Sequence, residues 1–219
     1  MPARVIVVVL GKQGAGKGTQ CRRLAQHLGV PQVSTGDILR AAVRDATPVG
    51  LEVASILAAG QLVSDELVNR LVEARFADAD AARGALLDGY PRTEGQARAL
   101  DEILGADGVK LCINLDVANA LVAARLSSRR VCQECGAIYR DTDIEAISGT
   151  CSNCGGDVVQ RADDMPEAIM QRLEVYERDT APLLSFYEER GLLVRVEGDQ
   201  DPQEVTADIL EVLAERGLA

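Results

Sequence analysis

Tryptophan is absent from the chain, histidine occurs once, and there is no long apolar run. The apolar stretch near the amino terminus, Val5 to Leu10, is too short for the apolar segment of a signal peptide and far too short to span a bilayer. The single histidine, His27, lies near the end of the first predicted helix, where we expect a surface position and no role as a metal ligand. We therefore expect a cytoplasmic protein.

The chain has fewer basic than acidic residues: 23 lysines and arginines against 34 aspartates and glutamates, which gives a formal net charge of −11. This balance argues against a general attraction to nucleic acid or to an anionic membrane, so any polyanion must be bound locally. The 219 residues, 47% of them hydrophobic, suffice for one substantial core with small inserted subdomains. No apolar surface stripe is obvious, and we expect a monomer.

Short apolar segments alternate with helical ones along the chain. The predicted helices include Gly16 to His27 and Asp37 to Asp45, and the predicted strands are Val5 to Leu10, Gln32 to Val33, Ala85 to Asp88, Lys110 to Asp116 and Leu192 to Val196. Because the strands are rich in Val, Ile and Leu without polar alternation, we expect both of their faces to be buried. The pattern predicts an α/β fold, a doubly wound five-stranded parallel sheet flanked by helices.

Two stretches depart from this alternation. Residues 34–63 read as helices only, and residues 127–164 contain four cysteines and few apolar side chains. We interpret both as insertions, so the core is expected to comprise residues 1–33, 64–126 and 165–219.

A glycine-rich segment, Gly11 to Thr19 (GKQGAGKGT), follows the first strand and opens a helix. Its four glycines allow backbone N–H groups to turn toward a phosphate, the helix amino terminus favours an anion, and Lys17 supplies a positive charge. The residue after the lysine, usually Ser or Thr in such loops, is Gly18, and the hydroxyl follows at Thr19. The segment predicts a phosphate-binding loop (P-loop) for a nucleotide.

Further blocks follow this loop in order: STGDILR (34–40), GQLVSDELV (60–68), LDGYPRTEGQA (87–97), RLSSRR (125–130), RADD (161–164), QRLEVY (171–176) and TAPL (180–183). With these blocks the chain resembles the adenylate kinases, within the nucleoside monophosphate kinases, over nearly its whole length. The resemblance implies reversible, Mg²⁺-dependent transfer of the terminal phosphoryl group from ATP to AMP, giving two ADP. Gln13, Tyr90 and Ser128 replace the family's usual proline, phenylalanine and glycine, and none of these changes removes a charge from the site.

By resemblance, the site residues divide by substrate, and arginine is suited to both because its planar fork can hold phosphate oxygens in pairs. ATP would be bound by Gly14, Ala15, Gly16, Lys17, Gly18, Thr19, Arg125, Arg129, Ile138, Tyr139 and the backbone near Gln200. AMP would be bound by Thr35, Arg40, Gln61, Leu62, Val63, Gly89, Arg92, Gln96, Arg161 and Arg172. The catalytic set would be Lys17, Arg92, Arg129, Arg161, Arg172 and Asp88, with Asp88 orienting the waters of a nucleotide-bound Mg²⁺.

The choice of base rests on fewer residues. Gln96 would read the adenine edge, because an amide can donate and accept at once. Thr35 also favours AMP, whereas pyrimidine kinases of the family tend to have a smaller residue there. Ile138 would either line the donor adenine or pack inside a small lobe. A different pairing, with GTP as donor or with UMP or CMP as acceptor, is the alternative within the enzyme class.

Four of the six cysteines form the spacing C-x2-C-x15-C-x2-C: Cys132, Cys135, Cys151 and Cys154. In a reducing compartment such pairs bind metal more often than they form disulfides, and this spacing predicts a tetrahedral, structural four-thiolate site. Zinc is the first choice and iron the alternative. A lobe of about forty residues with few large apolar side chains needs such a metal in place of a core. By resemblance, this lobe, residues 127–164, is a zinc-ribbon-like lid over the donor nucleotide, and residues 34–63 are a small helical insertion that binds the nucleoside monophosphate.

The remaining two cysteines, Cys21 and Cys112, lie on the first helix and inside an apolar strand, and we interpret both as small buried hydrophobic residues.

A nucleotide sensor that contacts RNA or DNA through the cysteine-rich lobe is the alternative from another functional class. Such a lobe should carry a basic face and exposed aromatic side chains. Residues 136–160 contain one arginine, one tyrosine and several acids. The composition therefore favours the enzyme, with ATP, AMP and ADP as partners and with no nucleic-acid or membrane partner.

Overall fold

A computed structural model describes residues 4–218 of the protein. Its central sheet has five strands in the order β2-β3-β1-β4-β8, and every neighbouring pair is parallel. The strands are β1 (Val5–Leu10), β2 (Gln32–Ser34), β3 (Gly84–Asp88), β4 (Leu111–Asp116) and β8 (Leu193–Glu197). The predicted parallel α/β sheet is therefore confirmed, and the predicted strand ends differ from the observed ones by at most one residue.

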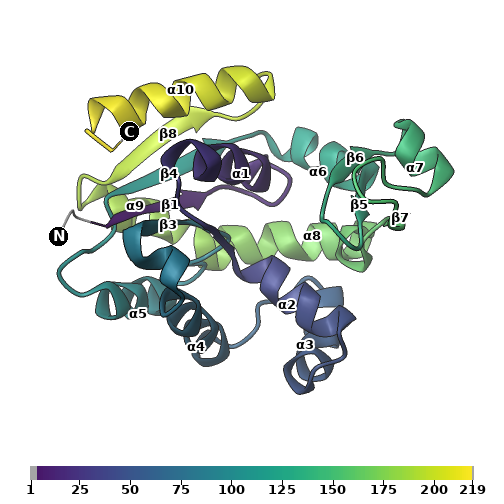
Figure 1. Ribbon diagram of the computed structural model, residues 1–219, viewed down its shortest axis with the longest axis horizontal. Coiled ribbons are helices and arrows are strands. Elements are labelled where there is room, and N and C mark those ends of the chain that lie inside the picture. Colours follow the sequence, from purple (N-terminus) through teal and green to yellow (C-terminus); the bar gives the residue numbers. More distant parts are fainter. Residues whose placement is uncertain (1–3, 219) are drawn as a thin grey trace.

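The sheet separates two apolar layers, because alternate side chains of each strand face opposite sides. On the middle strand, Ile6 and Val8 pack with one layer of helices and Val7 and Val9 with the other, and all four are 0% exposed. The first layer includes α4 (Asp65–Phe76), α5 (Glu94–Leu104) and α9 (Pro182–Glu188), with the 3₁₀ turn η1 (Ala79–Arg83) leading into β3. The second includes α1 (Lys17–Leu28), α6 (Asn119–Ser128) and α10 (Pro202–Glu215) (Figure 1).

The first helix begins where the glycine-rich loop ends. Its N-cap residue, Gly16, has φ 101°, a left-handed backbone conformation that residues other than glycine rarely adopt. The loop thus turns sharply from the carboxyl end of β1 into α1, and Gly29, also left-handed with φ 62°, ends the helix.

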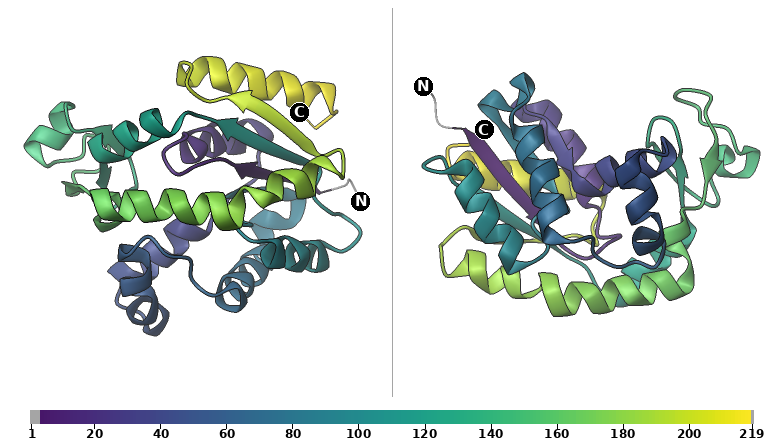
Figure 2. Two further views of the ribbon diagram at one scale, coloured as in Figure 1. Left: turned by 180° about the vertical axis from the view of Figure 1, so that it is seen from behind. Right: turned by 90° about the horizontal axis from the view of Figure 1, so that it is seen from below.

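Residues 34–63 contain two helices packed on each other, α2 (Thr35–Arg44) and α3 (Pro48–Ala58). Ser34 caps α2 by accepting a hydrogen bond from the Asp37 backbone, so the helix begins two residues before the predicted Asp37. A Cβ at Gly50 would lie 1.9 Å from the Ala42 carbonyl oxygen, so glycine is what allows the two helices to approach. The pair lies apart from the sheet (Figures 1 and 2).

Residues 127–164 form a second, three-stranded antiparallel sheet in the order β6-β5-β7. Its elements are β5 (Arg129–Cys132), β6 (Ile138–Arg140), α7 (Ile144–Ser148), β7 (Val158–Val159) and η2 (Ala162–Asp164). The buried cluster of this lobe consists of two cysteines, Ala137 and Val158, which is a very small apolar core. In Figure 1 the lobe lies at the far end of the molecule from β8.

A long helical run connects this lobe to the core. It comprises α8 (Pro166–Val175), the π-helical turn η3 (Tyr176–Thr180) and α9. Figures 1 and 2 show that the run passes along one side of the molecule from the small lobe to the far edge of the sheet. Among residues 4–218, no helix combines the length and the apolar character needed to cross a membrane.

Candidate functional site

The glycine-rich loop holds Lys17 at the carboxyl end of β1. Its ammonium group donates hydrogen bonds to the carbonyl oxygens of Gly11 (2.7 Å) and Lys12 (2.8 Å). Burial lowers the pKa of Lys17 to about 8, although the negative charge of Asp88 opposes that shift. Because burial disfavours the charged form of this lysine, a bound anion such as a phosphate would stabilise its positive charge.

Asp88 ends β3 beside this loop. Its carboxylate accepts a hydrogen bond from the Gln32 amide at 2.9 Å, and burial raises its pKa despite the nearby charge of Lys17. A Cβ at Gly18 would lie 3.2 Å from the Asp88 carboxylate. Glycine after Lys17 therefore leaves room for this carboxylate. This gives a physical reason why the loop has its hydroxyl at Thr19 and not at position 18.

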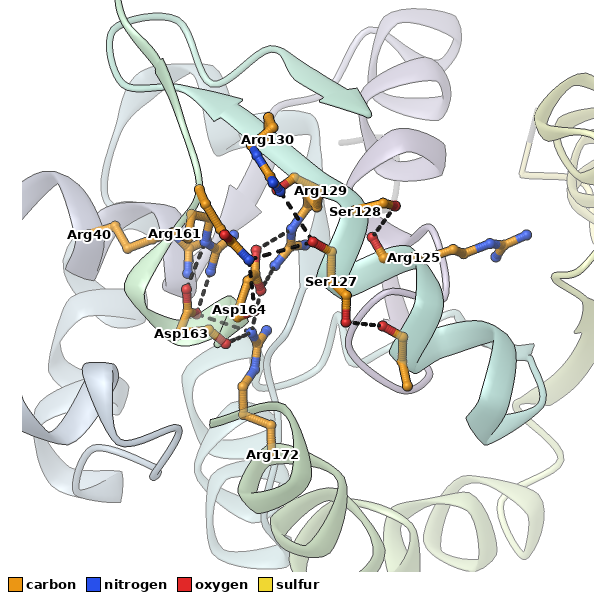
Figure 3. Close-up of polar contacts among 12 residues, drawn as sticks. Arg40, Arg125, Ser127, Ser128, Arg129, Arg130, Arg161, Asp163, Asp164 and Arg172 are labelled. Atoms are coloured by element: carbon orange, nitrogen blue, oxygen red, sulfur yellow. Dashed lines mark hydrogen bonds and ion pairs between the residues drawn. The ribbon is translucent and has the colours of Figure 1, made fainter. Parts of the chain in front are cut away.

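Arginines from four separate segments meet between the two inserted segments (Figure 3). Arg161 forms a two-bond ion pair with Asp163, at 2.8 and 2.5 Å. Arg172 donates to the Asp163 carbonyl oxygen at 2.7 Å and to the Asp164 carboxylate at 3.0 Å. Arg129 forms a second two-bond pair with Asp164, and Arg40 reaches toward Arg161 from α2 (Figure 3).

Asp163 and Asp164 organise these arginines, and sequence reasoning assigned neither of them a role. Burial alone would raise the pKa of Asp163, but the hydrogen bonds from Arg161 and the charge of Arg172 hold it well below its usual value. Burial also lowers the pKa of Arg172 to about 10, against the opposing charge of Asp163. The signal was present in the RADD block, where two acids stand two and three residues after a predicted phosphate-binding arginine.

A pocket lies between α2, the segment after α3 and the segment after β3. Of the predicted acceptor residues, all except Arg161 line it: Thr35, Arg40, Gln61, Leu62, Val63, Gly89, Arg92, Gln96 and Arg172. Thr35 donates to the Gly89 carbonyl oxygen at 3.0 Å. The Gln96 amide accepts from the Arg92 backbone at 2.8 Å and donates to Asp65 at 2.8 Å, so protein groups already orient it.

A second pocket lies beside the glycine-rich loop and is lined by Gln13, Lys17, Gly89, Arg92 and Thr180, among others. Gly89 and Arg92 line both pockets. The two pockets therefore meet at the segment that follows β3.

The residues predicted for the donor nucleotide are more dispersed. Arg125 points away from the arginine cluster (Figure 3) and donates to the Gly198 carbonyl oxygen at 2.9 Å. Gln200 follows close after Gly198 and donates to Asp208 at 3.0 Å. Ile138 is 46% exposed, whereas the Tyr139 hydroxyl lies 3.1 Å from the Cys151 sulfur and so faces the cysteines.

The four cysteines of the small lobe converge. Their sulfur atoms all lie within 4.8 Å of one another, with Cys132 to Cys154 at 3.5 Å and Cys135 to Cys151 at 3.6 Å. Four sulfurs around a tetrahedral zinc ion with bonds of about 2.3 Å would be about 3.8 Å apart. The donor set and its spacing therefore fit a metal ion.

Glycines make the two cysteine turns. Gly136 and Gly155 have φ of 71° and 76°, a left-handed conformation that permits the tight turn after each C-x2-C pair. The other two cysteines, Cys21 and Cys112, are 0% exposed and burial raises the pKa of both thiols, which confirms their interpretation as buried hydrophobic residues. His27 is exposed, as predicted.

Comparison with known proteins agrees with this geometry. A family model described as adenylate kinase matches residues 9–192. The chain is 47% identical over 210 residues to the adenylate kinase of Symbiobacterium thermophilum, covering 94% of this chain and 97% of that protein. It is 46% identical over 214 residues to that of Novosphingobium aromaticivorans (96% and 99% covered) and 44% identical over 210 residues to that of Bacillus subtilis (94% and 97% covered). The chain therefore belongs to the adenylate kinase family of phosphotransferases.

Proposed function

We propose that this chain catalyses the reversible, Mg²⁺-dependent transfer of the terminal phosphoryl group of ATP to AMP, giving two ADP. The observation that carries the proposal is that Gly89 and Arg92 line both the pocket beside Lys17 and the pocket that contains Thr35 and Gln96. Two phosphate-binding sites that share an arginine place one nucleotide's terminal phosphate next to the other's, which is what transfer requires.

On the donor side, Lys17 and the N–H groups of residues 14–19 would hold the β- and γ-phosphates of ATP. Anion binding would release Lys17 from its two carbonyl contacts and restore its full charge. Arg125, next to the Gly198 carbonyl oxygen, and the backbone near Gln200 would contact the adenosine.

On the acceptor side, Arg40 and Arg92 would bind the AMP phosphate, with Thr35 and residues 61–63 against the adenine. Gln96 would read the base edge, because its amide keeps a second N–H and a second lone pair beyond those used by Asp65 and Arg92. The preset orientation of this amide supports a preference for one base.

Between the two nucleotides, Arg129, Arg161 and Arg172 would neutralise the charge that spreads over the transferring group. Asp163 and Asp164 hold these three side chains in fixed directions before substrate binds. The protein then needs little reorganisation at the moment of transfer. Mg²⁺, when bound with ATP, supplies further charge neutralisation, and Asp88 would orient its waters.

We further propose that residues 34–63 and 127–164 act as mobile covers over the acceptor and the donor. A contact between them supports this view, since Arg44 on α2 donates to the Gln133 carbonyl oxygen at 3.0 Å. Closure of both covers would exclude water from the phosphoryl group.

We propose a structural Zn²⁺ bound by the four cysteines, with iron as the alternative metal. Four protein thiolates would fill a tetrahedral metal and leave no position for substrate. The very small apolar cluster of this lobe supports a stabilising role. Free thiolates persist in a reducing compartment, so we place the protein in the cytoplasm.

The test is ADP formation from ATP with AMP, GMP, CMP and UMP offered separately, on protein whose bound metal has been counted by elemental analysis. We expect turnover with AMP and about one zinc per chain, and GTP in place of ATP tests the donor. Lys17→Met should abolish nearly all turnover while the circular dichroism spectrum stays unchanged. Turnover that persists in this variant would show that the loop does not act as proposed.

Absence of turnover with every acceptor, together with tight nucleotide binding, would contradict the enzyme. It would favour a nucleotide sensor, for which a salt-dependent shift of a labelled oligonucleotide is the next measurement.

A further inference from the structure

We propose that Tyr139 is a positioning residue of the lobe's metal site, because its hydroxyl donates a hydrogen bond to the Cys151 sulfur and makes the four thiolate ligands unequal. The inference rests on the proposed four-thiolate site. It assigns to Tyr139 a role different from the adenine contact that the family resemblance implied.

The small sheet determines which way this side chain faces. β6 pairs with β5 so that Ile138 lies opposite Val131 and Tyr139 lies opposite Arg130. Neighbouring residues of a strand face opposite sides. Ile138 is accordingly 46% exposed, while the Tyr139 ring packs against the cluster that contains the buried Cys132 and Cys151.

The hydroxyl is within bonding distance of two groups. Its oxygen lies 3.1 Å from the Cys151 sulfur and 3.3 Å from the Ser152 hydroxyl. Both partners precede Cys154 within the second cysteine turn. The ring therefore spans the distance from the sheet to this turn.

The direction of each hydrogen bond follows from the charge on sulfur. A cysteine bound to a metal is a thiolate and carries no proton, so Cys151 can only accept. Tyr139 must then give its single proton to the sulfur, and Ser152 can only donate to the tyrosine oxygen. The result is a chain from Ser152 through Tyr139 to Cys151, and a hydrogen bond to an ionised acceptor is stronger than one to a neutral acceptor.

Cys151 differs from the other three cysteines in its hydrogen bonding. Within residues 4–218, it is the one of the four cysteines whose sulfur contacts a side-chain hydroxyl. Groups that hydrogen-bond to metal ligands fix the direction of the ligand and commonly change metal affinity by about 10- to 100-fold. We therefore expect the Tyr139 hydroxyl to raise the metal affinity of the lobe.

The test compares Tyr139→Phe with the unaltered full-length protein, because this change removes the hydroxyl and keeps the ring. Zinc affinity is measured by competition with a chelating dye, and the thiolate-to-metal charge-transfer bands are recorded after Co²⁺ substitution. We expect about 10- to 100-fold weaker zinc binding and bands at longer wavelength, because the sulfur electrons lose a stabilising proton. Ser152→Ala should shift both readouts in the same direction and by less.

Tyr187→Phe is the matched control. It deletes a hydroxyl that is buried in the core and forms no hydrogen bond with any residue of the described range 4–218. We expect the same zinc affinity and the same Co²⁺ spectrum as in the unaltered protein.

Three outcomes would overturn the inference in distinguishable ways. If the unaltered protein binds neither zinc nor Co²⁺, the four-thiolate site itself is wrong. If it binds one metal and Tyr139→Phe binds it within twofold and with identical bands, the metal site stands and the role of Tyr139 is wrong. If metal affinity is unchanged but the KM for ATP rises, Tyr139 serves the donor nucleotide instead.

Discussion

The carboxylate of Asp164 receives two parallel hydrogen bonds, at 2.7 and 2.5 Å, from the guanidinium of Arg129, which lies 35 residues earlier in the chain. Asp164 is 0% exposed and also accepts a hydrogen bond from Arg172 (Figure 3). One buried acid thus connects the first strand of the small lobe to the helix that leads back to the core.

Asp164→Asn should lower the free energy of unfolding by about 3 kcal/mol, because the buried Arg172 and the partly buried Arg129 lose the negative charge that they share. Turnover should fall as well, since both arginines are proposed to act on the transferring group. Urea denaturation and kcat measure the two effects. Asp179→Asn removes the acid of the surface pair with Arg178 and should change the free energy of unfolding far less, because solvent screens this pair. Equal losses in the two variants would refute a special role for Asp164.

When ATP binds above pH 8, Lys17 should take up a proton from solution. The pKa of Lys17 is lowered to about 8 in the unliganded protein, so much of it is neutral at pH 8.5, and phosphate binding favours the charged form. Below pH 7 the lysine is already protonated and no uptake is expected from it. Calorimetric titration at pH 8.5 in two buffers of different ionisation enthalpy measures the uptake. Lys17→Arg, which keeps its charge, should lack it, and an identical uptake in that variant would contradict the assignment.

Removal of the metal should lower Tm much more than it lowers activity at low temperature. Free zinc at a hundred times its dissociation constant stabilises by about 2.7 kcal/mol, which corresponds to roughly 5–10 °C in Tm for a chain of this size. Scanning calorimetry and ADP formation, each with and without a strong chelator, provide the comparison. Cys135→Ser should show the low Tm already, with no further fall on chelation. Immediate loss of turnover with an unchanged melting curve would argue against a structural metal.

Gln13→Pro should stabilise the protein by about 0.5–1 kcal/mol. Within residues 4–218 the buried Gln13 side-chain oxygen accepts no hydrogen bond, and Gln13 is not among the residues with positive φ, so its φ does not exclude proline. Gln13→Ala removes the oxygen without restricting the backbone and separates the two contributions. Thermal unfolding measures both, and a lower Tm in the proline variant would mean that the loop needs a conformation that proline forbids.

Tyr90→Phe should cost about 1 kcal/mol, although phenylalanine is the commoner family residue at this position. The Tyr90 hydroxyl is buried and lies 2.8 Å from the Asn69 side-chain oxygen and 3.1 Å from the Gln96 carbonyl oxygen. Removing it leaves Asn69 without this donor. Urea denaturation tests the cost against Tyr187→Phe, which should be close to neutral because the Tyr187 hydroxyl has no hydrogen-bond partner in the part of the chain that the structure describes. Equal effects would show that the bond to Asn69 contributes nothing.

The central sheet was predictable because strands such as Val5–Leu10 are apolar on both faces, a pattern that a single strand displays by itself. The strand order was not predictable, because β8 lies beside β4 through pairs of residues some eighty positions apart in the sequence. The cysteine spacing predicted a zinc-ribbon-like lobe, but its individual strands could not be located because β7 has two residues and β6 has three, too few for any periodicity. Those short strands also decide which way Tyr139 faces.

The candidate site divides in the same way. Lys17 and the acceptor residues belong to compact blocks and could be named from the sequence. The ion pairs of Asp163 and Asp164 could not be predicted, because their three arginine partners lie in three separate blocks of the sequence.

The very small buried cluster of the lobe, with Cys132, Ala137, Cys151 and Val158, also bears on how such a lobe can evolve. With so little apolar surface to fall back on, the loss of one cysteine would leave three ligands and no alternative source of stability. A lineage that exchanged these cysteines for other residues would then have had to change the four positions nearly together, or to pass through ancestors whose lobe was stable only at low temperature.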